Sequence, residues 1–161
     1  MKKILISAGA LAALALTTPA NAANTAQANA TVNIVSPLSL TKNTDLNFGT
    51  IVGPFASQVV HVDTAGARNC GGLTCSGTYG AATFTVTGTP DQDVTLTIPN
   101  SVTLNGPSGS LNVDMTTDKP ADPTLDSGGS ASFGVGGKLT IPSGTADGVY
   151  SNTFDVTADY K

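Results

Sequence analysis

The side chains that could act as nucleophiles, bases or metal ligands are few and scattered along this 161-residue chain. His61 is the only histidine, and it alternates with Val60 and Val62, so a strand here would turn it to the opposite face. The sequence contains no Gly-x-Ser-x-Gly nucleophile motif. Because catalysis needs an oriented nucleophile and base, paired carboxylates or a metal, we expect no enzymatic activity and no cofactor.

The two cysteines, Cys70 and Cys75, are separated by four residues. Two thiolates without a neighbouring histidine make a poor zinc site, and thioredoxin-like redox pairs are spaced by two residues. In an oxidising compartment the two thiols can close a small loop. The sequence therefore predicts a loop-stapling disulfide and no metal.

The acidic residues are all aspartates, and four of them recur every fourth residue from Asp114 to Asp126. Calcium accepts clustered carboxylates, but a loop of the EF-hand type ends in glutamate, which this chain lacks. A pair of glycosidase carboxylates would need a sugar-binding cleft, and the chain has no tryptophan to line one. We therefore interpret these aspartates as solvated loop charge.

The N-terminus has the pattern of a secretory signal peptide. Lys2 and Lys3 precede an apolar run over residues 4–16, and Ala20-Asn21-Ala22 fits a signal peptidase site. Cleavage after Ala22 would leave one domain, residues 23–161, with no membrane span. Its net charge would be 5 − 11 = −6, because two of the seven basic residues are removed. The remaining basic residues are scattered, which excludes nucleic acid as a partner.

Short runs of alternating apolar and polar residues, separated by glycine- and proline-containing turns, predict an all-β protein. The leading architecture is an immunoglobulin-like antiparallel β-sandwich, with a small barrel as the alternative. Residues 65–80 and 116–129 do not alternate and are predicted to be long surface loops. The predicted strands include residues 32–34, 46–48, 60–62, 83–87, 94–98, 111–116 and 139–141.

The longest alternation is in the last fourteen residues, 148–161. One parity carries most of the apolar side chains and the other carries mainly serine, threonine, aspartate and lysine. The candidate functional residues of this strand are Gly148, Tyr150, Phe154, Val156, Ala158 and Tyr160.

With a tyrosine next to last and a glycine fourteen from the end, this strand resembles that of the pilins of chaperone–usher fibres. The stretches PLSL at 37–40, DLNFGTI at 45–51 and YSNTFDVTADY at 150–160 are similar to an exported bacterial domain-of-unknown-function family of pilin-like proteins. The resemblance implies a fimbrial subunit that passes through the periplasm to the cell surface. Its partners would be a periplasmic chaperone, an outer-membrane usher and copies of itself or related subunits, joined by β-strand exchange.

A donor strand for such exchange should be a free N-terminal extension with alternating apolar residues. After the predicted cleavage site, apolar residues do occupy alternate positions, although most of their side chains are small. Residues 32–35 could instead belong to the domain's own first strand. The free extension would then be about 23–30. The candidate donor residues are Ala26, Ala28, Ala30, Val32 and Ile34. The alternative function is a monomeric secreted or surface β-sandwich that binds a carbohydrate or protein ligand through its loops.

Overall fold

The computed structural model describes residues 24–53, 56–119 and 121–161. The chain divides into two compact units, Met1–Asn33 and Ile34–Lys161. Within the first unit, residues 24–33 form no helix or strand and are all exposed. The predicted signal peptide, residues 1–22, lies outside the described residues. In the described part of the chain, no helix has the length and apolar character needed to cross a membrane.

The second unit is all-β, which confirms the predicted class, and its described residues contain no helix. Every strand pairing is antiparallel, and the largest sheet is curled into a half-barrel. The strands are β1 (Ser39–Thr44), β2 (Thr50–Ile51), β3 (Gln58–Val62), β4 (Arg68–Asn69), β5 (Cys75–Ser76), β6 (Ala82–Thr87), β7 (Val94–Thr97), β8 (Ser101–Gly106), β9 (Gly109–Thr117), β10 (Ser130–Ile141) and β11 (Thr157–Tyr160).

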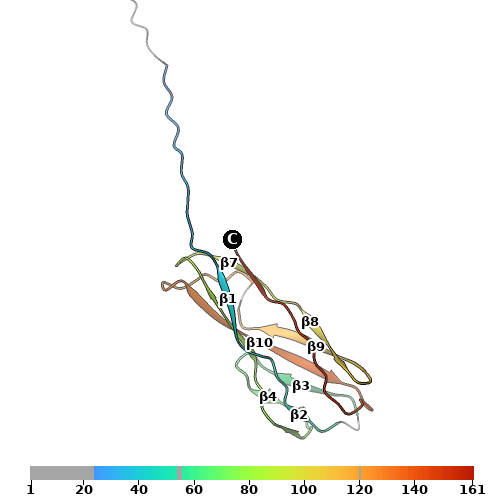
Figure 1. Cartoon of the computed structure of the whole chain (residues 1–161). Coiled ribbons are helices and arrows are strands. Elements are labelled where there is room, and N and C mark those ends of the chain that lie inside the picture. Colours follow the sequence, from blue (N-terminus) through green and yellow to red (C-terminus); the bar gives the residue numbers. More distant parts are fainter. Residues whose placement is uncertain (1–23, 54–55, 120) are drawn as a thin grey trace, which may run out of the picture. The chain divides into compact units, whose positions relative to one another are not determined.

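Strand β10 is the centre of the large sheet (Figure 1). Val135 pairs with β6 on one edge and β9 on the other, and Gly137 pairs with β3 and β9 in the same way. Strands β6 and β3 therefore follow one another along one edge, while β9 occupies the opposite edge. The order around the curl is β1-β6-β10-β9-β8, and the C-terminal segment continues it through paired backbone bonds between Asn105 and Ser151.

The apolar side chains inside the curl form two clusters. The first cluster consists of Phe48, Val60, Val62, Ala81, Leu111, Val113, Leu139 and Ile141. The second cluster consists of Ala82, Phe84, Val86, Val94, Leu96, Leu125, Phe133 and Val135. Within the second, the Phe84 ring stacks on Phe133 with centroids 5.4 Å apart and meets the edge of Phe154 at 6.3 Å. The contact between Phe84 and Phe154 attaches the C-terminal segment to the second cluster.

The end of the chain is fixed by pairing and by one hydroxyl group. Strand β11 pairs with β7, and its half-buried side chains pack on the second cluster. The Tyr160 hydroxyl donates to the Ser36 carbonyl (2.8 Å) and accepts from the Thr89 amide (2.7 Å). A side chain 124 residues away in sequence therefore holds the chain just before β1 begins.

Several sequence-based expectations differ from the structure. Residues 46–48 are not a strand, since Asn47 forms only an isolated bridge with Gly80. The segment 65–80 is not a continuous loop, because it contains the short strands β4 and β5. Residues 32–34 are not a strand, because they have no strand partner among the described residues. The C-terminal alternation extends beyond its strand, since regular pairing covers only Thr157–Tyr160. The segment 116–129 is not simply a surface loop: Leu125 is 1% exposed and its amide donates to the Gln92 carbonyl. The predicted Cys70–Cys75 disulfide is confirmed, with Cα atoms 6.3 Å apart.

We expect Leu125→Ala to lower the free energy of unfolding by about 2–5 kcal/mol, because it removes a fully buried side chain from the second cluster. Urea denaturation measures the loss. Val149→Ala is the control, since Val149 is 82% exposed and its truncation should change stability by no more than about 0.5 kcal/mol. Equal effects of the two substitutions would contradict the placement of Leu125 in the core.

We expect Tyr160→Phe to cost about 1–2 kcal/mol of stability, because the ring stays while two hydrogen bonds are lost. Thermal unfolding of the two proteins gives the difference. Tyr79→Phe is the matched control, since Tyr79 is 47% exposed and keeps its ring contact with Arg68. A Tyr160→Phe protein as stable as the control would rule out an anchoring role for the hydroxyl group.

Candidate functional site

A groove with an apolar floor opens beside the first core cluster, with a cavity volume of about 630 Å³. Its floor comes from strands β8, β9 and β10, and consists of Val102, Leu104, Leu111, Val113, Leu139 and Ile141. Two segments far apart in sequence form its sides: residues 46–51, here called the first wall, and residues 148–154, the second wall. The volume lies within the range of about 300–1,000 Å³ that is usual for binding pockets.

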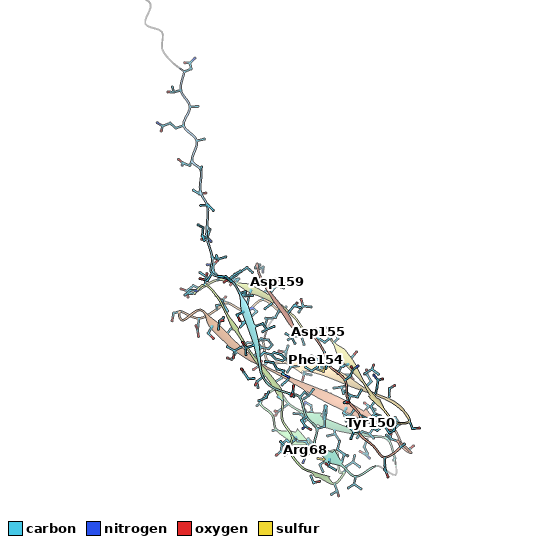
Figure 2. All side chains as sticks on the ribbon, in the orientation of Figure 1. Arg68, Tyr150, Phe154, Asp155 and Asp159 are labelled. Atoms are coloured by element: carbon cyan, nitrogen blue, oxygen red, sulfur yellow. A yellow bond between two sulfur atoms is a disulfide. The ribbon has the colours of Figure 1, made fainter. Side chains whose placement is uncertain are left out.

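The second wall is attached to β8. The Asn105 and Ser151 backbones exchange two hydrogen bonds of 3.0 Å, and the Asn152 side-chain amide donates to the Thr103 carbonyl (2.8 Å). The Tyr150 ring covers Gly106 so closely that a side chain there would collide with it. Figure 2 shows Tyr150 and Phe154 on this C-terminal segment. The wall is therefore held on its β8 side, while Tyr150 and Phe154 line the groove.

The backbone edges that flank the groove have few partners. Among the described residues, 153–156 make no backbone–backbone hydrogen bond. On the other side, the first wall contains β2, which among the described residues has β5 as its single strand partner. Strand edges of this kind can accept the backbone groups of an additional strand. The apolar floor thus lies between two backbone segments that each have an edge without a strand partner in the described residues.

The outward parity of the C-terminal segment is charged. Asp155 and Asp159, labelled in Figure 2, are exposed, as is Lys161. Lys161 Nζ lies 2.8 Å from Asp122 Oδ2, and this hydrogen bond, helped by the Thr95 hydroxyl, lowers the pKa of Asp122. The same bond raises the pKa of Lys161. Since both groups are exposed, the ion pair contributes little to stability. The segment is held mainly by the packing of its apolar side chains.

The structure separates the six predicted residues of the terminal strand into two sets. Gly148, Tyr150 and Phe154 line the groove. Val156, Ala158 and Tyr160 instead pack against the second core cluster, beyond the end of the groove. Val156, Ala158 and Tyr160 thus cover the second core cluster, whereas Gly148, Tyr150 and Phe154 border the groove beside the first.

The predicted donor residues are all exposed, from Ala26 to Ile34. The two largest, Val32 and Ile34, are 84% and 85% exposed. Sequence reasoning missed the floor residues Val102 and Leu104 of β8, although their alternation with Ser101, Thr103 and Asn105 is a strand signal.

The residues first considered for chemistry lie apart from the groove. His61 is in β3, opposite Lys138 of β10 and Asn69 of β4. The Cys70–Cys75 disulfide leaves no free thiol. Within the described ranges, no three side chains of histidine, cysteine or aspartate converge to form a metal site.

The groove lies within the part of the chain that a known family covers. No curated protein and no solved structure matches the chain. The family described as "Domain of unknown function (DUF4402)" matches residues 38–160, a range that contains every strand and both walls of the groove. Because this match extends over more than half of the sequence, the chain belongs to the DUF4402 family.

Proposed function

We propose that this protein is a structural subunit of an exported bacterial surface fibre, and that its groove accepts an extended strand from the next copy. The observation that carries the proposal is the groove with its apolar floor, flanked by two backbone segments that each have one unpaired edge among the described residues. A strand inserted there would supply backbone hydrogen bonds along its edges and place alternate side chains on the floor. Export itself rests on the signal-peptide pattern of residues 1–22.

The physical driving force for such insertion is burial of apolar surface. The floor is formed by aliphatic side chains of the first core cluster and of β8. Each Å² of apolar surface removed from water contributes about 25 cal/mol. Backbone pairing adds directionality, because an edge strand accepts an extended chain in only a few registers. Both contributions require the same kind of partner, an extended segment with apolar residues at alternate positions.

The occupant we propose is the N-terminal extension, residues 24–35, of a second copy. Residues 24–33 have no regular structure, and the apolar side chains Val32 and Ile34 are almost fully exposed. The second wall spans seven residues, about 23 Å of strand. The seven residues from Ala28 to Ile34 match this length and offer four apolar side chains on one parity.

The same proposal gives the finer fold and the partners. A donor strand between the two walls would complete the curled sheet as an immunoglobulin-like sandwich. Before assembly, an extended strand from a periplasmic chaperone would cover the groove, and an outer-membrane usher would exchange it for the next subunit's extension. The destination of the assembled protein would be the cell surface.

We expect the exported protein to form multimers that survive as ladders on a denaturing gel, and the double substitution Val32→Asp/Ile34→Asp to abolish them. Two carboxylates on the apolar parity would have to be buried in the groove without partners. Thr31→Asp/Asn33→Asp adds the same charge on the opposite parity and should leave the ladders intact. Ladders from the first variant, or a monodisperse wild-type monomer, would refute assembly through the extension.

A mixing experiment tests the groove and the extension separately. Leu104→Asp should block the groove while its extension stays intact, and Val32→Asp/Ile34→Asp should do the reverse. Each variant alone should remain monomeric, and an equimolar mixture should stop at dimers, because only one productive interface can form. Thr103→Asp, on the exposed face of β8, is the control for the groove substitution. Size-exclusion chromatography with light scattering gives the masses, and a mixture that stays monomeric would contradict the pairing.

A further inference from the structure

Arg68 joins several parts of the chain behind the first wall. Its Nη1 atom donates to the Phe48 carbonyl (2.8 Å) and to the Ser76 carbonyl (3.1 Å). Its guanidinium carbon lies 4.0 Å from the centroid of the Tyr79 ring, a cation–π contact. In the view of Figure 2, Arg68 lies to the left of Tyr150 in the lower half of the domain. Arg68 does not line the groove, so any effect on an occupant would act through the wall.

Apart from the core packing of Phe48 and its neighbours, the backbone of the first wall has little other support. Its backbone bonds run to residues 74–80: Asn47 pairs with Gly80, β2 pairs with β5, and the Val52 amide donates to the Thr74 carbonyl. Strands β2 and β5 have only two residues each. So short a ladder is weak by itself, since two-stranded pairings are marginally stable. The Arg68 hydrogen bonds join its two sides, one on Phe48 and the other on Ser76.

The backbone at Gly49 is shaped around this guanidinium. Gly49 has φ of 78°, which favours glycine, and a Cβ there would collide with Arg68 Nη1 and the Ser76 carbonyl. The turn at Gly49 lies between Phe48, which is buried in the first core cluster, and Ile51, which lines the groove. The bond from Arg68 to the Phe48 carbonyl thus fixes the point where the wall changes direction.

We infer that Arg68 is the positioning residue of the groove: by holding the Phe48 and Ser76 carbonyls, it keeps the first wall in the geometry that an incoming strand requires. This inference rests on the proposed function and adds a residue that touches no part of the occupant. Val52 donates its amide toward β5, so the alternation of a strand directs the Ile51 backbone groups to the opposite, free edge. Loss of the Arg68 bonds would leave these pairing groups without a fixed register.

The test uses the full chain with Val32→Asp/Ile34→Asp, in which the groove is free, and a fluorescent synthetic peptide of residues 24–35. Arg68→Met keeps the aliphatic stem and removes both donors, and we expect it to weaken peptide binding about tenfold or more, as loss of charge-assisted hydrogen bonds predicts. Arg68→Lys keeps a charged donor group but lacks the planar guanidinium, and it should fall between. Lys138→Met removes an exposed cation from β10 and should bind within about twofold of the parent.

Hydrogen–deuterium exchange supplies the reading that distinguishes positioning from general destabilisation. In Arg68→Met, amides of residues 47–52 and 74–80 should exchange faster, while those of β10 and the unfolding midpoint stay as in the parent. Faster exchange throughout β10 would overturn the inference, and so would unchanged exchange in the wall or unchanged peptide affinity. If the parent groove does not bind the peptide, the proposed function fails, and wall exchange alone decides the role of Arg68.

Discussion

Backbone pairing along β10 organises the whole domain. This one strand has β6 and then β3 along one edge and β9 along the other, so it orders the two ends of the sheet as well as its centre. Residues 133–137 of β10 are buried. Neighbouring backbone comes so close to this stretch that a side chain at Gly136 would collide with the Val62 carbonyl and Asp63. The curl, its two core clusters and the gap between its outer edges all follow from this arrangement.

The two core clusters differ in how they are closed. The second is covered by the C-terminal segment, whose Phe154, Val156 and Ala158 side chains pack onto it. The first is covered only in part, and its aliphatic residues form the floor of the groove. Near Phe154 the C-terminal segment changes from lining the groove to covering the second cluster, since this side chain touches Phe84 and also lines the groove. A single chain segment therefore completes one half of the core and borders the unfilled half.

The sequence predicts those strands that have one face in the core and the other face exposed to solvent. Strands β3, β6, β7 and β9 alternate between buried and more exposed residues, and their pattern was recognisable. Residues 133–137 of β10 are buried on both faces and rich in glycine, so this part of the strand carries no period-two signal, whereas its end, residues 139–141, alternates and was predicted. Strand β8 follows Pro99-Asn100 and ends in Asn105-Gly106, directly before Pro107, and these residue types are typical of turns, which obscures the strand. Leu125 occupies an irregular segment, where periodicity cannot reveal burial.

The candidate site was predictable only in part. Gly148, Tyr150 and Phe154 were identified from the terminal alternation, but the groove also needs the β8 floor and the wall at residues 46–51. These segments meet because of the order of strands around the curl, which depends on long-range pairing. The role of Arg68 has the same origin, since its partners Phe48 and Ser76 become neighbours only in the folded chain.

The separation of the groove from the extension also matters for any chain of subunits built in the proposed way. The acceptor is formed by strands of the second compact unit, whereas most of the donor belongs to the first. A linear assembly would therefore have chemically distinct termini, with a vacant acceptor at one and an unused donor at the other. Such polarity would allow growth and attachment to occur at different ends, and it would demand a specialised cap wherever the vacant acceptor faces water.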